Sequence, residues 1–295
     1  MKKLYLFIFI TLFAISGFAA LWQDFAKIEV KAIKVAGSVY MIAGTDDMAA
    51  FSGGNIGVSV GEDGVIMVDS KFAPLGDKIK AAIKEIGGDL PKYVINTHVH
   101  DDHLNGNSVF STDGTIIAHT NIRKRLADKP KNLWPVITFD QSLSIHMNGE
   151  EIKAIHYPKG HTDGDAIIYF TGSNVVHMGD HLFNKMFPYV DLNSGGTVQG
   201  FMANIKKTLA EISENVKIIA GHGPLASKAD LQENYRMLEE TVALVTQKMK
   251  DGKSLDEIKK EGLQEEWKSW SWNFITEEKW IEKIYTSHLE KEASK

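Results

Sequence analysis

The residues best suited to chemistry are crowded into one short stretch, NTHVHDDHLNGN, at positions 96–107. Three histidines and two aspartates fall between His98 and His103. Burying so many polar side chains without a cation would cost several kcal/mol in desolvation and mutual repulsion. Neutral imidazole and carboxylate are ligands that zinc takes at ~2.0–2.2 Å. The stretch therefore predicts a metal site rather than a surface group of histidines.

The spacing within this stretch suggests how the ligands are shared. His98 follows the apolar run KYVIN at 92–96, which is typical of a buried strand. In an extended strand exit, residues two apart point the same way, so His98 and His100 can converge on one ion. Asp102 and His103 come where the chain turns, and they could serve a second ion beside the first.

Three later motifs repeat the pattern of a polar ligand type just past an apolar run. PKGHTDGD at 158–165 contains His161, VVHMGDHLF at 175–183 contains Asp180, and IIAGHGP at 218–224 contains His222. Glycine stands beside each of these three residues, and it allows the backbone to approach a site closely. Strand ends pool their loops at a sheet edge, so these motifs are expected to complete the metal site.

Apolar runs typical of strands alternate with helical stretches along the first half of the chain. The expected strands cover 39–43, 56–60, 65–69, 92–96 and 115–119, and the expected helix covers 76–87. This order predicts a mixed α/β sheet protein. Segments 58–69 and 168–180 each read as strand, polar turn and strand ending in aspartate. They indicate an internal duplication, or else two hairpins that merely look alike.

The tail changes character after Pro224. Residues 227–252 predict one long helix with Ser227 as its N-cap. Its apolar stripe predicts core packing and consists of Leu231, Tyr235, Leu238, Val242, Val245 and Met249. Four tryptophans follow at 267, 270, 272 and 280. They are expected to pack a terminal subdomain or, alternatively, to roof a substrate pocket.

Composition excludes some classes of function. The net charge is −5, and the sequence has no run of lysine and arginine long enough to attract nucleic acid. The chain has no cysteine, so it uses neither disulfides nor a thiolate as ligand or nucleophile. Chemistry must therefore come from histidine, carboxylate, hydroxyl or lysine, acting on a small-molecule substrate.

Residues 1–19 have the layout of a secretory signal peptide. Lys2 and Lys3 precede an apolar run, and small residues close the segment. The alternative is a retained membrane anchor, but Thr11, Ser16 and Gly17 interrupt a run shorter than the roughly 20 residues that a span needs. We expect cleavage and export, giving a periplasmic or secreted protein without a stable membrane anchor.

Taken in order, H-x-H-x-D-H, G-H-T-x-G-D, G-D and G-H-G-P resemble the metallo-β-lactamase superfamily, over about residues 39–225. The resemblance implies the four-layer αβ/βα sandwich of that family, an α/β fold in which two facing mixed sheets carry helices outside and metals at one edge. Residues 20–225 would form this domain. Residues 226–295 would form a helical C-terminal extension packed on it.

The resemblance also implies a ligand set. The first metal would be held by His98, His100 and His161, the second by Asp102, His103 and His222, and Asp180 would bridge both. Asp69, at the end of the strand at 65–69, would hydrogen-bond a ligand or the loop that carries it. The expected cofactors are two Zn²⁺ ions per chain.

Such a site implies a hydrolase. Two zinc ions that share a water lower its pKa towards ~7, which makes hydroxide available at neutral pH. Asp102 and Asp180 would act in catalysis by neutralising charge and orienting that hydroxide. It would attack a carbonyl, and the metals would stabilise the oxyanion. The expected reaction is hydrolysis of an ester, lactone, thioester or β-lactam-type amide.

Other activities stay open. The bridging Asp180 resembles glyoxalase II and lactonases, which argues against true β-lactamase activity, whereas export argues for it. Persulfide dioxygenases of the superfamily bind one iron with the counterparts of His98, His161 and Asp180. A binding protein with an inactive site is a further alternative.

The loop at 181–196 follows Asp180 and should border the site. Lys185 could pair with a substrate carboxylate, Tyr189 could donate to the oxyanion, and His181 could line the pocket. The alternative for these residues is ordinary surface and packing. His177 is expected to point away from the metals, because it lies on the strand face opposite to Asp180.

Overall fold

The computed structural model describes residues 24–45 and 51–293 of the 295-residue chain. The expected signal peptide, residues 1–19, lies outside the described residues. Within the described ranges, no helix combines the length and the apolar character needed to cross a bilayer.

The first sheet contains seven strands in sequence order, from β1 to β7. Their bounds are Val30–Ala36, Val39–Gly44, Ile56–Gly61, Gly64–Val68, Pro91–Ile95, Thr115–His119 and Ile137–Phe139. Strands β1 to β4 pair antiparallel, and β4 to β7 pair parallel. The five strands expected from the sequence are therefore confirmed as β2 to β6, with ends that shift by at most one residue.

The second sheet contains six strands, again in sequence order, from β8 to β13. Their bounds are Ser142–Met147, Glu150–His156, Ala166–Phe170, Val175–His177, Lys217–Ile219 and Ala226–Ser227. Strands β8 to β11 pair antiparallel, β11 and β12 pair parallel, and β13 closes the sheet antiparallel. Both sheets thus begin as an antiparallel meander and continue into a parallel strand. Segments 58–69 and 168–180 occupy matching hairpins, β3–β4 and β10–β11, as a duplication requires.

Alternating side chains join the layers. Ile66 and Val68 of β4 belong to the same buried core as Ile152 and Ile168 of the second sheet, so this core lies between the two sheets. Val65 and Met67 point the other way and pack under helix α1, Gly76–Glu85, through Ile79 and Ile83. Because neighbouring residues of a strand face opposite sides, each strand serves two cores.

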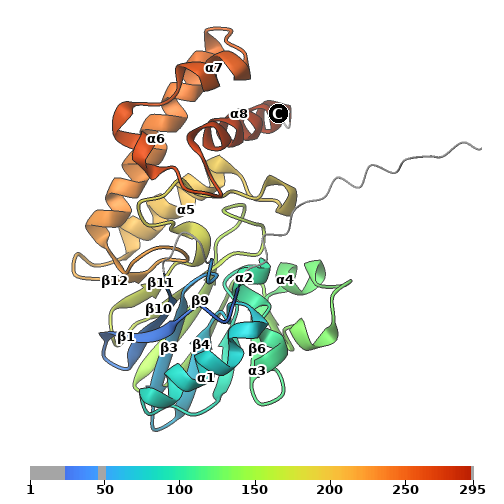
Figure 1. Cartoon of the computed structure of the whole chain (residues 1–295), viewed down its shortest axis with the longest axis vertical. Helices are drawn as coiled ribbons and strands as arrows, with labels where there is room; N and C mark the ends of the chain where they lie inside the picture. Colours follow the sequence, from blue (N-terminus) through green and yellow to red (C-terminus); the bar gives the residue numbers. More distant parts are fainter. Residues whose placement is uncertain (1–23, 46–50, 294–295) are drawn as a thin grey trace, which may run out of the picture.

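Helices cover the outer faces of both sheets (Figure 1). Short helices α2, α3 and α4, at Asp101–Leu104, Asn107–Phe110 and Thr120–Arg125, lie on the side of the first sheet. Helix α5, Val198–Glu211, packs through Phe201 against Ile167 and Ile218 of the second sheet. Four 3₁₀ turns complete this part, at Ala73–Leu75, Lys131–Leu133, Gly179–His181 and Leu192–Ser194. The expected αβ/βα sandwich is confirmed.

The C-terminal segment forms helices beyond one end of the sandwich (Figure 1). They are α6, Lys228–Lys250, α7, Leu255–Glu261, the 3₁₀ helix η5, Glu265–Trp270, and α8, Glu277–Ala293. The predicted N-cap Ser227 closes a capping box with Asp230. The stripe on α6 is offset from the predicted one, since Met237 and Thr241 are buried while Tyr235 is only partly buried.

The tryptophans of this segment divide between two places. Trp267, Trp270 and Trp280 are buried in the core that continues from the second sheet. Trp272 is only partly buried, and its ring centre lies 6.3 Å from that of His222. Packing therefore explains three of the tryptophans, and one reaches the loops at the sheet edge.

Candidate metal centre

Four loops carry the predicted ligands to one edge of the sandwich. His98 and His100 follow β5, and Asp102 and His103 lie within the short helix α2. His161 lies between β9 and β10. Asp180 sits in the 3₁₀ turn after β11, and His222 follows β12. The seven side chains that the sequence singled out are brought together at this edge.

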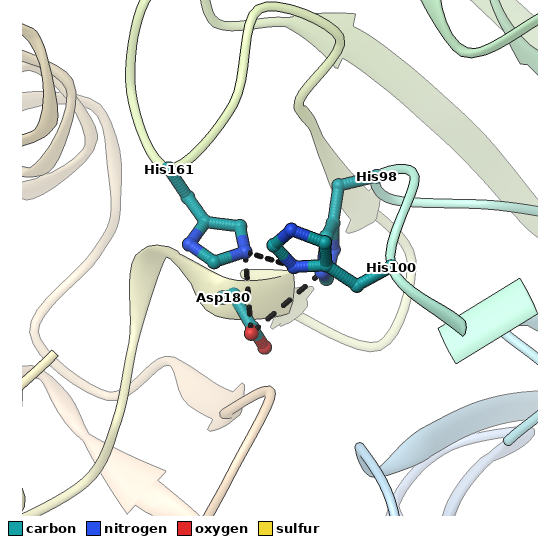
Figure 2. Close-up of side chains that lie close together, drawn as sticks. All are labelled: His98, His100, His161 and Asp180. Carbon is teal, nitrogen blue, oxygen red and sulfur yellow. Dashed lines mark hydrogen bonds and ion pairs between the residues drawn. The ribbon is translucent and has the colours of Figure 1, made fainter. Parts of the chain in front are cut away.

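One group of possible ligands contains His98, His100, His161 and Asp180, each offering an atom within 4.8 Å of the others. Figure 2 shows the three imidazoles pointing towards the Asp180 carboxylate. Nε2 of His161 lies 2.8 Å from Nδ1 of His100 and 3.4 Å from Oδ2 of Asp180. Nε2 of His98 lies 3.6 Å from the same oxygen. This convergence of ring nitrogens on one carboxylate oxygen is the arrangement of a metal-binding group.

A second group contains Asp102, His103 and His222, again with one atom of each within 4.8 Å of the others. Nε2 of His222 lies 3.3 Å from Oδ2 of Asp102, and Nε2 of His103 lies 3.6 Å from it. The two histidine nitrogens are 3.3 Å apart. The second group is therefore as closely assembled as the first.

Asp180 stands between the two groups. Its Oδ2 faces His98 and His161, at the distances given above. Its Oδ1 faces the other group and lies 3.0 Å from Nε2 of His103 and 3.4 Å from Nε2 of His222. One carboxylate thus presents a different oxygen to each group, as a bridging ligand does.

Asp69 fixes two of the histidines from behind. Its Oδ2 lies 2.7 Å from Nδ1 of His103 and accepts a hydrogen bond from the Thr97 hydroxyl. The Thr97 hydroxyl oxygen lies 3.0 Å from Nδ1 of His98 and can accept a hydrogen bond from it. These partners favour a proton on Nδ1 of each ring, which leaves Nε2 of each as the atom that would bind a cation.

The loop at 189–196 orients the other two histidines of the first group. Nδ1 of His161 donates to the carbonyl of Tyr189 at 2.7 Å. Nε2 of His100 donates to Oδ2 of Asp191 at 3.0 Å. His161 therefore offers Nε2 to the centre, whereas His100 offers Nδ1. This outward partner for each inward nitrogen is the usual support of metal-bound histidine.

The backbone of Asp69 adds a further sign of constraint. Its φ is 65°, in the left-handed region that non-glycine residues rarely adopt, and its side chain is fully buried. Its carboxylate also accepts the backbone N–H of Thr97 at 2.7 Å. Unusual backbone held by several hydrogen bonds is common where a protein positions a functional site.

Burial and neighbouring charges shift the pKa values of the ligand side chains in opposite directions. Burial lowers the pKa of His98 well below its ordinary range and lowers that of His161 to about 3. Burial would also lower the pKa of His222, but Asp180 and Asp102 raise it to about 9. Burial would raise the pKa of Asp102, and His103 with His222 lowers it to about 2. Burial thus favours the neutral form of His98 and His161, whereas the neighbouring carboxylates raise the pKa of His103 and His222 and favour their protonated form when no metal is bound.

Two atoms of the centre are buried without a hydrogen bond. Nε2 of His98 and Oδ1 of Asp180 find no hydrogen-bonding partner among the described residues. A buried polar atom left in this way costs about 1–3 kcal/mol, and more when it is charged. A cation would satisfy both, and imidazole with carboxylate is a donor set that zinc accepts. The residues therefore fit a metal ion.

Glycine is required at two contacts with the ligands. A Cβ on Gly221 would lie 2.1 Å from Oδ1 of Asp180. A Cβ on Gly54 would lie 2.0 Å from the ring of His103. Gly221, which precedes His222 in the sequence motif, thus leaves room for the Asp180 carboxylate of another loop.

The remaining predicted residues occupy different surroundings. Lys185 is exposed, and its Nζ lies 3.9 Å from Oδ1 of Asp230. The ring of Tyr189 lies 5.7 Å from that of His100. His181 is buried, stacks on Phe201 and bonds with Asn204. That inward position gives no support to the prediction that His181 contacts substrate.

Three further residues support the site, and the sequence analysis gave none of them a role there. His177, expected to point away, donates from Nε2 to the carbonyl of Asn55. Asp165 accepts two hydrogen bonds from Thr162 and so braces the loop of His161, although the sequence suggested no role for it. Asp191 was also missed, and nothing local marks it, because its partner lies 91 residues away.

Comparison with known proteins identifies the family. A family model described as "Metallo-beta-lactamase superfamily" matches residues 50–222, more than half of the chain. The chain belongs to this superfamily.

Individual relatives and a solved structure are similar to the chain over most or part of its length. The chain is 29% identical over 136 residues to a hydroxyacylglutathione hydrolase of Pelagibacter ubique, covering 44% of this chain and 51% of that protein. It is 22% identical over 235 residues to a metallo-β-lactamase type 2 of Elizabethkingia meningoseptica, covering 77% and 91%. A metallo-β-lactamase structure from Pontibacter korlensis superimposes with a TM-score of 0.61 and 16% identity, covering 72% of this chain and 99% of that one. The chain thus spans about half of the hydroxyacylglutathione hydrolase and nearly all of the metallo-β-lactamases.

Proposed function

We propose that this protein is an exported dinuclear zinc hydrolase that cleaves a carbonyl substrate. The observation that carries the proposal is Asp180, whose two oxygens face two separate groups of ligands. Membership of a superfamily whose relatives are metal-dependent hydrolases supports the same reaction class.

Each residue has a distinct part in this proposal. His98, His100 and His161 would hold one ion, Asp102, His103 and His222 the other, and Asp180 both. When bound, two zinc ions supply Lewis acidity and lower the pKa of water towards ~7. The histidine tautomers set by Asp69 and Asp191 keep lone pairs directed inward.

The carboxylates set the charge of the site. Asp102 is ionised at neutral pH, because its pKa is lowered to about 2 by His103 and His222 despite burial. Asp102 and Asp180 together offset part of the charge of two divalent cations. An ionised carboxylate can also accept a hydrogen bond from water and so orient it towards a carbonyl.

The intact second group of ligands distinguishes this proposal from a mononuclear iron oxygenase. Asp102, His103 and His222 lie within 4.8 Å of one another, with Asp180 beside them. A site for one ion would leave these three buried or half-buried side chains without a role. Zinc in both groups is accordingly the proposed state.

The proposed substrate is an ester, lactone, thioester or β-lactam-type amide. The similarity to a hydroxyacylglutathione hydrolase supports a thioester, and the similarity to a metallo-β-lactamase supports an amide. The signal-peptide layout of residues 1–19 supports export to a periplasmic or secreted location.

Chelation and reloading test the function. The mature protein, stripped and reloaded with zinc, is assayed against nitrocefin, homoserine lactones, thioesters and aryl esters while its metal content is measured. We expect hydrolysis of at least one class, lost on stripping and restored at two zinc ions per chain. Activity indifferent to chelation would refute the proposal, and one iron with oxygen uptake would replace it by the oxygenase.

A further inference from the structure

The segment at 271–276, between η5 and α8, connects the helical extension to the metal centre. The ring of Trp272 lies 6.3 Å from that of His222 and 6.0 Å from that of Phe183. Its indole N–H donates to the carbonyl of Phe187 at 2.9 Å. Its backbone N–H donates to the carbonyl of Ile275, which closes the segment on itself. Trp272 is therefore fixed beside a predicted ligand by partners outside the metal centre.

Phe274 extends the line of rings to the surface. It is 52% exposed, and its ring lies 5.6 Å from that of Trp272 and 5.3 Å from that of Tyr189. Tyr189 in turn lies 5.7 Å from His100 and 5.8 Å from His161. An unbroken series of aromatic contacts thus runs from solvent to a histidine of each ligand group. We call Tyr189, Trp272 and Phe274 the aromatic rim.

Lysines of α8 hold the outer rings in place. Nζ of Lys279 donates to the carbonyl of Phe274 at 2.8 Å and lies 5.6 Å from the centre of its ring. Nζ of Lys283 lies 5.2 Å from the ring centre of Tyr189. Contacts of a cation with a ring face are favourable, so the exposed rings are fixed rather than loose. The rim is therefore preorganised for contact with a ligand.

We propose that the aromatic rim is the subsite for a large apolar group, aryl or medium-chain alkyl, on the substrate of this hydrolase. The inference rests on the proposed function and names the part of the substrate that lies beyond the reacting carbonyl. It assigns the helical extension a role in specificity, because Trp272 and Phe274 both belong to that extension.

Position favours this role over an ordinary exposed hydrophobic side chain. Val136 and Leu289 are also exposed, at 72% and 51%, but the ring contacts described above, which lead to the ligands, run through Tyr189, Trp272 and Phe274 instead. Fixed aromatic faces beside a polar reaction centre are typical of ligand sites, in which apolar walls surround a few oriented polar groups. The rim offers ring faces and few hydrogen-bonding atoms, so it suits an apolar group better than a peptide.

The test compares Phe274→Ala with Leu289→Ala, a matched loss of an exposed apolar side chain on the same extension. Acetate, butyrate, hexanoate and phenylacetate are titrated calorimetrically into each zinc-loaded full-length protein. Hydrolysis of the corresponding aryl esters is measured in parallel. We expect affinity and kcat/KM of the wild type to rise about fourfold for each methylene that becomes buried. Phe274→Ala should flatten this rise, with the largest losses for hexanoate and phenylacetate. Phe274→Leu should restore part of the rise, and Leu289→Ala should retain it.

The two readouts separate the subsite from the reaction. If no ester is cleaved but carboxylate affinity still rises with chain length, the hydrolase proposal fails and the apolar subsite stands. A flat series in the wild type, or an unchanged slope in Phe274→Ala, overturns the subsite. A change of oligomeric state in Phe274→Ala alone, seen by light scattering, would also overturn it and make the rim a contact between copies of the chain.

Discussion

Two groups of histidines in this protein are held in opposite ways. At the metal centre, ring protons point outward to Asp69, Asp191 or a carbonyl, and lone pairs point inward at one another. Near the ends of β6 and β9, His119 and His156 stack with ring centres 3.7 Å apart. Backbone atoms satisfy this pair, since His119 bonds to the carbonyl of Asp140 and His156 to that of Asp165.

The difference shows what identifies a metal ligand. Burial lowers the pKa of histidines in both places, so a shifted pKa does not distinguish them. The distinguishing feature is a buried nitrogen left without a hydrogen bond, as at Nε2 of His98, beside a carboxylate that faces several rings. Variants in the two regions should therefore affect different properties.

The largest effect is expected from Asp180→Ala. Because both groups of ligands share this carboxylate, the variant should lose both ions, and kcat/KM should fall by more than the ~100-fold typical for residues that only support a ligand. Metal analysis and kinetics measure the two losses. His119→Gln with His156→Gln is the control and should keep both ions, and full activity in Asp180→Ala would remove the basis of the comparison.

Asp69→Ala is expected to affect both metal binding and folding. It removes the acceptor for His103 and for two hydrogen bonds of Thr97, all buried. Loss of one partner of a buried charged pair costs about 3–5 kcal/mol. Urea unfolding of the metal-free protein should show this loss. A variant as stable as the wild type would mean that Asp69 supports the centre only when metal is bound.

Asp191→Ala should weaken metal binding with less effect on stability. Its carboxylate fixes the Nδ1 lone pair of His100, and loss of such support typically costs 10–100-fold in metal affinity or activity. Asp191→Asn keeps an oxygen that can accept the same proton, so it should fall between Asp191→Ala and the wild type. Competition with a zinc chelator measures the affinity, and equal affinities in all three proteins would contradict the assignment.

The smallest effect concerns pH and the stacked pair. Burial lowers the pKa of His119 and His156 in the folded protein, with the charge of His156 adding to the effect on His119. The unfolded chain therefore takes up protons on these residues first as pH falls below about 6.5, and the free energy of unfolding drops. Urea unfolding of metal-free protein between about pH 5 and 8 should show a shallower slope when both are glutamine. Parallel slopes would mean that the pair does not titrate on unfolding.

The sequence predicted the parts of this protein that depend on local pattern. Alternating apolar runs gave strands β2 to β6, and Ser227 gave the start of α6. The ligand motifs were recognisable because each places a histidine or aspartate just past a strand, so the assembled sheets bring them together.

Contacts between distant segments could not be predicted in the same way. Asp191 and His100 are 91 residues apart, and no motif links them. The choice of Nδ1 on His100 also follows only from that partner. Trp272 looked like its three neighbours in sequence, yet its chain position after η5 takes it to His222 while the others enter the core.

The central claim is that two ions lie on either side of the Asp180 carboxylate. A crystal structure of the zinc-loaded protein, with diffraction measured on both sides of the zinc absorption edge, tests it directly. We predict two anomalous peaks, one among His98, His100 and His161 and one among Asp102, His103 and His222. A single peak, or peaks remote from Asp180, would contradict the account.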